Sequence, residues 1–402
     1  RRRLQPDRMS FPLRILNPGG KSMLSEEELK KRAWPEKSTV PVGNYSPYVT
    51  CGRVFNRALR LKQALSEPIP AGECAITSLC CGSDGRIYGA TSGRQSHLFL
   101  YDPAPEEDSV YDLGVLPGAT SVDRALVSGA GCLYGAISDG PEKGRLFRYT
   151  LRKGYVKETV RTLLFGEISY LPCPLLGESI VSLVLDSKRL LLYGLGRKSG
   201  LLFCYSVSEE KLITSVNLDK HGRFSEALVL DQHGNIYGCA GPDFFFKSGP
   251  GYLSLETLNY RLPTVAGRSL YNRLQAAVYH EKEGLIYGAG SADGILFAFS
   301  PDSGRGYTIG KPTAAAGCPV LLSGKDNCLY GLNGSREGMA HLFRYELTTR
   351  SLDDLGILYA SSEIPWHGYE FASGCVGTNG ELYLGETDRI SHLFLYFPPH
   401  RT

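Results

Sequence analysis

The stretch Gly85-Arg86-Ile87-Tyr88-Gly89, followed by His97-Leu98-Phe99-Leu100-Tyr101, decides the fold of this 402-residue chain. It has the form of a turn, a short apolar strand with Tyr-Gly, a loop, and a second strand with Leu-Phe-x-Tyr. Related phrases follow six more times. They centre on Tyr134 with Phe147, Tyr193 with Phe203, Tyr237 with Leu253, Tyr287 with Phe297, Tyr330 with Phe343, and Tyr383 with Phe394. Self-similarity of this kind indicates a repeat architecture.

The spacing of the repeats identifies that architecture. Successive key tyrosines are 46, 59, 44, 50, 43 and 53 residues apart, which is the length of one four-stranded propeller blade. A small-residue-rich innermost strand, such as Ala125-Leu126-Val127-Ser128, precedes the turn, and a polar outer strand ends each unit except the last. The sequence therefore predicts an all-β protein, a seven-bladed β-propeller of four-stranded antiparallel blades.

The two ends of the repeat array predict how the ring closes. The last repeat stops at Phe397-Pro398, before any outer strand. The segment 53–62 is predicted to supply that strand, which would remove an exposed sheet edge. Residues 49–402 then form the propeller, and residues 1–48 an irregular N-terminal arm. Residues 1–70 carry 14 Lys+Arg against 6 Asp+Glu, so the arm is interpreted as a solvated basic tail, with a binding role as the alternative.

Composition excludes several functional classes. The net charge of +3 is close to neutral and gives no sign of a nucleic-acid or membrane partner. No run of 18 apolar residues is present, so no membrane span is predicted. The eleven cysteines have no paired spacing and no Cys/His ligand pattern. We therefore expect no disulfide framework, no metal and no cofactor.

A comparison among the repeats gives candidate site residues. Counting 16 and 14 residues back from the key tyrosine reaches the entry to each innermost strand, and four repeats have small residues at both places. The fourth, fifth and seventh carry His221 with Arg223, Tyr271 with Arg273, and His367 with Tyr369. Innermost strands face the propeller axis, so these six side chains are expected to meet at the mouth of the central channel. Arg124 is expected to join them, and Trp366 offers a stacking surface.

The alternative is a channel lining without catalytic function, in which the arginines pair with carboxylates such as Asp219 and Glu226. Three other histidines, His97, His341 and His392, share one repeat position on separate third strands and are interpreted as structural. The stretch 241–247 is interpreted as an insertion, either a lid or sugar-stacking platform or a packed apolar loop.

The candidate residues suit one reaction class better than others. Without a paired carboxylate, ordinary glycoside hydrolysis is not favoured. Histidine, tyrosine and arginine do suit β-elimination on a uronic acid. In that reaction a base removes the proton next to the carboxylate, the neighbouring C–O bond breaks, and an acid protonates the leaving oxygen. Arginine would bind the carboxylate and stabilise the developing charge.

The Tyr-Gly and Leu-Phe-x-Tyr units resemble the propeller polysaccharide lyases, especially the ulvan lyase type. The resemblance covers roughly residues 50–400 at the level of the blade pattern, and no catalytic motif of the family is matched residue by residue. It implies a seven-bladed fold and a metal-free His/Tyr/Arg centre. We expect His221 or His367 as base, Tyr369 or Tyr271 as acid, and Arg223 and Arg273 as the carboxylate clamp.

The predicted function is thus a polysaccharide lyase that acts on an anionic polysaccharide or oligosaccharide as a monomer. The rival hypothesis is a non-catalytic propeller that binds a glycan or a protein. An enzyme of another propeller class, such as a cyclotransferase, is a third. The compartment stays open, because the cysteine usage favours the cytoplasm whereas a lyase favours a secreted or periplasmic location.

Overall fold

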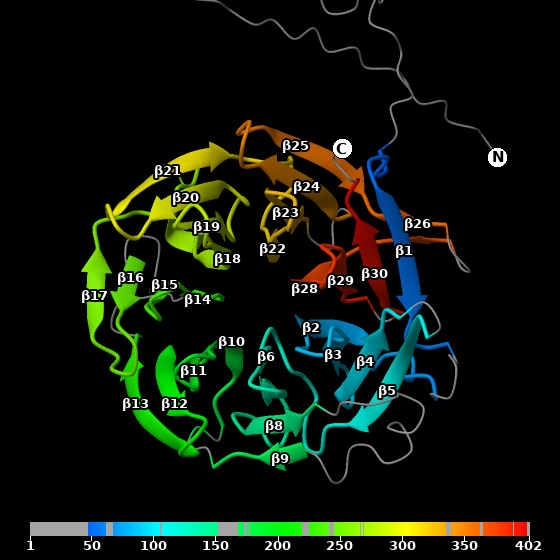
Figure 1. Ribbon diagram of the computed structural model, residues 1–402, viewed down its shortest axis with the longest axis horizontal. Coiled ribbons are helices and arrows are strands. Elements are labelled where there is room, and N and C mark those ends of the chain that lie inside the picture. Colours follow the sequence, from blue (N-terminus) through cyan, green and yellow to red (C-terminus); the bar gives the residue numbers. More distant parts are fainter. Residues whose placement is uncertain are drawn as a thin grey trace, which may run out of the picture. The chain divides into compact units, whose positions relative to one another are not determined.

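The computed structural model describes most of the chain from Pro47 onward. The described residues are 47–61, 67–104, 107–151, 168–172, 175, 177–218, 225–240, 245–265, 267, 269–334, 339–361, 365–388 and 390–399. They contain seven four-stranded antiparallel sheets arranged as blades around one axis, as predicted (Figure 1). All but the last two residues of the predicted arm, 1–48, lie outside the described residues. No helix in the described part is long and apolar enough to cross a membrane.

Each blade runs from an innermost strand beside the axis to an outer strand. In that order the blades are β2 (Ala75–Cys81), β3 (Ile87–Ser92), β4 (His97–Asp102) and β5 (Ser109–Val115); β6 (Leu126–Gly129), β7 (Cys132–Ala136), β8 (Leu146–Thr150) and β9 (Ile168–Tyr170); β10 (Ile180–Asp186), β11 (Leu191–Gly196), β12 (Leu201–Ser206) and β13 (Lys211–Asn217); β14 (Val229–Leu230), β15 (Ile236–Cys239), β16 (Phe245–Ser248) and β17 (Leu255–Leu258); β18 (Leu274–His280), β19 (Leu285–Gly290), β20 (Leu296–Ser300) and β21 (Arg305–Gly310); β22 (Val320–Ser323), β23 (Cys328–Asn333), β24 (His341–Glu346) and β25 (Leu352–Ile357); and β28 (Phe371–Val376), β29 (Leu382–Glu386), β30 (His392–Phe397) and β1 (Arg53–Ala58). Between blades lie the 3-10 turn η2 (Ser269–Tyr271) and the pair β26 (Tyr359–Ala360) and β27 (Trp366–His367).

The ring closes by pairing the two ends of the repeat array. β1 lies antiparallel to β30, from Arg53 opposite Phe397 to Ala58 opposite His392. It is the outer strand of the seventh blade, which otherwise holds the last three strands of the chain (Figure 1). The predicted closing segment, 53–62, therefore contains the closing strand.

The Tyr-Gly and Leu-Phe-x-Tyr phrases recur because they pack against each other across neighbouring strands. In the third blade, Gly194 of β11 lies opposite Phe203 of β12. A Cβ atom on Gly194 would be closer to the Phe203 ring than van der Waals contact allows. Equivalent pairs are Gly89 with Phe99, Gly135 with Phe147, Gly238 with Phe246, Gly288 with Phe297, and Gly331 with Phe343. Glycine is repeated there because the phenylalanine ring occupies the space of a side chain.

The repeated tyrosine is a buried hydrogen-bond donor. The Tyr88 hydroxyl donates to Asp84 at 2.8 Å, and the Tyr330 hydroxyl donates to Asp326 at 2.6 Å. In each case the carboxylate belongs to the turn four residues before the tyrosine. Burial, and then the neighbouring carboxylate, raise the pKa of both phenols above their ordinary value. These two tyrosines therefore fasten the hairpin turns of the first and sixth blades to their sheets.

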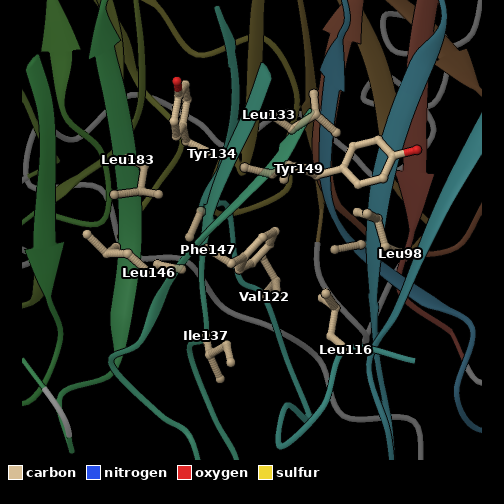
Figure 2. Close-up of a cluster of buried hydrophobic side chains, with 14 of the residues drawn as sticks. Leu98, Leu116, Val122, Leu133, Tyr134, Ile137, Leu146, Phe147, Tyr149 and Leu183 are labelled. Atoms are coloured by element: carbon tan, nitrogen blue, oxygen red, sulfur yellow. The ribbon is translucent and has the colours of Figure 1, made fainter. Parts of the chain in front are cut away.

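The core lies between blades as well as within them. Figure 2 shows Phe147 of the second blade between Leu98 of the first and Leu183 of the third. Phe147 and Leu98 are fully buried, and Leu183 nearly so. Burial of each such side chain stabilises the fold by about 1.5–3 kcal/mol. Neighbouring blades are therefore held to one another mainly by apolar packing.

The fourth blade corrects one prediction. The sequence pattern places Leu253 at its repeat position and predicts an insertion at 241–247. In the structure Phe246 lies opposite Gly238 and takes the repeat position, while Leu253 is only partly buried. Phe245 and Phe246 are fully buried in strand β16, so neither belongs to a lid or platform. The reason is a shorter connection between β15 and β16, which brings Phe246 closer in sequence to Tyr237. Residues 241–244 lie outside the described residues.

The three histidines of one repeat position hold carboxylates of their own blades. His97 Nδ1 lies 3.0 Å from Asp112 Oδ2, and His341 Nδ1 lies 3.0 Å from Asp354 Oδ2. His392 Nδ1 lies 3.3 Å from Glu386 Oε2. The three rings are on β4, β24 and β30, in separate blades, so the prediction that they lie on separate third strands is confirmed.

His97 is expected to make stability depend on pH. Its ring is buried between Asp112 and Glu73, with Nε2 3.2 Å from Glu73 Oε2. Burial disfavours the charged ring, but the two carboxylates outweigh it and raise the pKa of His97. A raised folded-state pKa gives stability that is complete below the unfolded pKa of about 6.5 and is lost as pH rises through the folded value.

The measurement is urea unfolding of wild type and His97→Gln across this pH range. The difference in unfolding free energy is expected to be largest at low pH, at about 1.4 kcal/mol for each unit of pKa shift, and to shrink as pH rises. His341→Gln is the matched control, because its ring is more exposed and contacts one carboxylate; it should show the smaller difference. A difference that grows with pH would contradict the assignment.

Candidate functional site

One end of the propeller axis carries a cavity of about 600 Å³. Its walls are residues that enter the innermost strands and residues that follow the second strands of the blades. The charged residues that line it are Asp123, Arg124, Arg197, Glu226 and Glu370. The volume is typical of a small-molecule pocket, and the balance of charges suits a polar ligand. This cavity is the predicted mouth of the central channel.

Arg124 crosses the channel beneath this cavity. It precedes β6 and has a left-handed backbone with a φ of 51°, which is uncommon outside glycine. Its Nη1 donates to the Gln275 carbonyl at 3.0 Å, and its Nε donates to the Ala372 carbonyl at 3.2 Å. Burial lowers the pKa of the guanidinium, and the charge of Glu226 acts in the opposite direction. Strained backbone of this kind is frequent at functional sites.

Glu226 joins two of the predicted site residues. Its carboxylate lies 3.6 Å from Arg124 Nη1 and 3.1 Å from Arg273 Nη2. Arg273 is at the entry to β18 and half-exposed, and Arg124 comes from the second blade. These two arginines therefore make the pairing that the alternative of an ordinary channel lining predicts. The single negative charge of Glu226 is thus shared between two guanidinium groups before any ligand arrives.

Arg197 is a cavity residue that the repeat comparison missed. It directly follows β11, is exposed, and lines the cavity. Among the described residues no carboxylate lies within ion-pair distance of its guanidinium. The signal was present in the sequence, four residues after the key tyrosine. The other repeats have Ser92, Ser138, Gly241, Ser291, Gly334 and Thr387 at this position.

Tyr271 and Tyr369 lie on the cavity rim and not among its lining residues. Tyr271 ends η2 and is 63% exposed, and its carbonyl accepts a hydrogen bond from Ser291, which lines the cavity. Tyr369 is 38% exposed and directly precedes the lining residue Glu370. Both residues are therefore next to lining residues, Tyr271 through a hydrogen bond of its backbone and Tyr369 along the chain.

The structure does not bring His367 or Trp366 into the cavity. Both belong to β27, whose partner β26 lies beside β1 at the outer part of the ring (Figure 1). The His367 ring lies 5.3 Å from the Tyr48 ring and 4.8 Å from the Tyr359 ring. A hairpin in the connection between the last two blades carries these residues outward, which the alignment of repeats does not reveal.

Trp366 instead covers a buried carboxylate. Its ring centre lies 4.5 Å from that of His392, and its Nε1 donates to Glu386 Oε2 at 3.0 Å. Glu386 is fully buried and also accepts the backbone N–H groups of Tyr369 and His392. This cluster fixes the segment that leads to the rim tyrosine Tyr369. Its role is to position that segment.

The candidate residues of the fourth blade, His221 and Arg223, lie outside the described residues, as does the carboxylate Asp219. In the described part of the chain, no group of three or more His, Cys, Asp or Glu side chains has a geometry that could hold a metal ion. The polar residues on the cavity are arginines, carboxylates, an amide and hydroxyls, whose chemistry is charge pairing and hydrogen bonding.

Comparison with known proteins bears on the fold alone. No protein-family model matches the chain, and no curated protein matches it. A streptogramin B lyase structure matches with a TM-score of 0.62 and 10% sequence identity, over 85% of this chain and 97% of that one. The extracellular domain of a protein described as a hybrid two-component system from B. thetaiotaomicron matches with a TM-score of 0.60 and 14% identity, over 87% of this chain and 40% of that one.

The shared feature is the seven-bladed β-propeller. At identities of 10% and 14% the likeness does not extend to the residues of a site. A propeller hosts many unrelated functions, so function must be argued from the cavity. The chain spans about two fifths of the length of the second structure.

Proposed function

We propose that the cavity binds the acidic unit of a carbohydrate and that Arg197 receives its carboxylate. The observation that carries the proposal is Arg197 itself. It is exposed on the cavity and has no carboxylate partner in the described part of the chain, whereas Glu226 already pairs with Arg124 and Arg273. An arginine fork binds a carboxylate through two parallel hydrogen bonds, which makes it specific for that group.

The rest of the cavity suits the hydroxyl groups of a sugar. Asp123 and Glu370 are acceptors, and the Gln275 side chain is both donor and acceptor. At the rim, Tyr271 and Tyr369 offer aromatic faces with a polar tip, which suits the apolar face of a sugar ring. This polar arrangement, with Arg197 as the arginine that no carboxylate of the described residues pairs, supports an oligosaccharide with an acidic unit better than an apolar ligand.

A second candidate is β-elimination of the bound uronate, as in a polysaccharide lyase. The observation that favours it is Arg197, an arginine with no carboxylate partner among the described residues, on one cavity with groups that can accept a proton. The carboxylates Asp123, Glu226 and Glu370 on this cavity overturn the expectation of a site without paired carboxylates, so their presence alone does not separate elimination from hydrolysis. Arg197 would neutralise the substrate carboxylate, and a base would take the proton from the adjacent carbon. The electron pair then forms the C=C bond as the C–O bond breaks, and an acid protonates the leaving oxygen. One structural neighbour is named a lyase, although its likeness is one of fold.

Arg197→Ala is expected to weaken binding of the acidic carbohydrate by about ten- to a hundred-fold, since hydrogen bonds to charged groups contribute about 1.5–3 kcal/mol. The measurement is titration calorimetry with polygalacturonate, alginate and hyaluronan, and with a neutral glucan as the non-acidic comparison. Lys198→Ala is the matched control, because Lys198 is the adjacent exposed cation and does not line the cavity.

Two results would overturn the proposal: equal losses in both variants, or no binding of any acidic polymer by folded wild type. The same mixtures of protein and acidic polymer also test whether the bound uronate undergoes β-elimination. Growth of ultraviolet absorbance from an unsaturated product, abolished in Arg197→Ala, would establish elimination. Binding without product would leave a non-catalytic carbohydrate-binding propeller.

A further inference from the structure

Two cavities lie along the propeller axis and meet at one level. The mouth cavity has a volume of about 600 Å³, and a second cavity of about 260 Å³ is lined by the innermost strands. Arg124, Glu226, Gln275, Pro319 and Ala372 line both. These five residues therefore mark the boundary between the two spaces.

The Arg124 side chain occupies that boundary. It comes from the second blade, yet it donates to carbonyls of Gln275 in the fifth blade and Ala372 in the seventh. It also pairs with Glu226 of the fourth blade. A side chain with partners on three other blades must cross the axis. Its left-handed backbone directs it there, and the hydrogen bond from its own N–H to the Thr77 carbonyl holds that backbone.

The two spaces differ in size and in what bounds them. Beyond the shared boundary, the smaller cavity is bounded by residues of the innermost strands, such as Leu79, Leu183 and Leu321. These side chains are almost entirely buried within the blades, so they leave little surface in the cavity. The Arg124 guanidinium is therefore the group that keeps a carbohydrate on the mouth side.

We propose that Arg124 makes the binding cavity blind, so that the site takes the end of an acidic sugar chain and not its interior. This inference rests on the proposed function. A polymer cannot pass along the axis, and a unit in mid-chain would have to leave the cavity by the mouth through which it entered. A terminal unit meets neither restriction. Arg124 is thus a positioning residue that sets the depth of the site.

The test uses the full-length protein and a polymer that binds in the calorimetric panel, partially hydrolysed to a series of shorter mean lengths. If chain ends are bound, the dissociation constant in uronate residues falls by the same factor as the mean length. Expressed in chain ends, it stays constant. A constant value per uronate residue would show interior binding and overturn the inference while leaving the proposed function intact. No binding at any length would overturn both.

Arg124→Ala supplies a second, independent readout. Removing the side chain joins the two cavities, so the shortest oligomer that reaches full affinity should become longer than for wild type. Arg124→Lys keeps a cation at the boundary and should keep the wild-type length. If folded Arg124→Ala, verified by thermal unfolding, retains the wild-type length preference, Arg124 is not the floor of the site. A merely structural role would change stability without changing this preference.

Discussion

Gly194→Ala is expected to lower the free energy of unfolding by about 3 kcal/mol, because it overpacks a buried contact. The new Cβ would lie 2.5 Å from Cε1 of Phe203 and 2.8 Å from Cδ2 of Leu183. Phe203 is fully buried and Leu183 is 4% exposed, so neither side chain can move aside without disturbing its neighbours. The measurement is urea unfolding followed by circular dichroism.

The chain supplies a matched control for this substitution. A Cβ on Gly249 would meet no heavy atom within 4 Å, and its φ is not left-handed, so Gly249→Ala should be close to neutral. Combining Gly194→Ala with Phe203→Leu should cost less than the sum of the single changes, because the smaller side chain vacates the space. Equal effects of Gly194→Ala and Gly249→Ala would show that the glycine–phenylalanine contact does not constrain the blade.

The second large effect is expected for Glu386→Gln, which should also destabilise by about 3 kcal/mol. The Glu386 carboxylate accepts hydrogen bonds from Trp366 Nε1 and from two backbone N–H groups, and it lies beside His392 Nδ1. A glutamine of the same shape replaces one acceptor oxygen with an NH₂ group that faces donors. At least one buried donor then loses its partner, and both Glu386 and His392 are fully buried.

Glu210→Gln is the comparison for this change. Glu210 pairs with Arg148 at 3.0 Å, but both side chains are partly exposed, so its loss should change stability by less than about 1 kcal/mol. Because Glu386 also holds the backbone of Tyr369, Glu386→Gln should weaken carbohydrate binding at the rim in protein that is still folded. Unchanged stability would mean that the buried cluster contributes nothing to the seventh blade.

Much of the fold was predictable from local pattern. The tyrosine spacing, the glycine opposite phenylalanine and the missing last strand predict seven four-stranded blades closed by a segment near residue 53. Each feature expresses a contact within one blade, between residues that are close in sequence. Where the pattern failed, in the fourth blade, a shorter loop displaced Phe246 from its expected distance to Tyr237.

The site was only partly predictable, because local patterns do not show which residues of different blades meet. Repeat comparison found Arg124 and Arg273 near the axis, and an extension of it to the position after the second strand would have found Arg197. It placed His367 at the mouth, whereas the structure puts its ring against Tyr48 and Tyr359.

The sequence alone thus determines which residues belong to each blade, because blade-forming contacts are local and repeat with a nearly constant period. Only the tertiary structure decides which polar side chains meet. Arg124, Glu226 and Arg273 come from three blades and lie far apart along the chain. Their meeting depends on a left-handed turn and on connections of unequal length, and neither obeys the repeat. The fold follows from what the blades share, and the candidate site follows from how they differ.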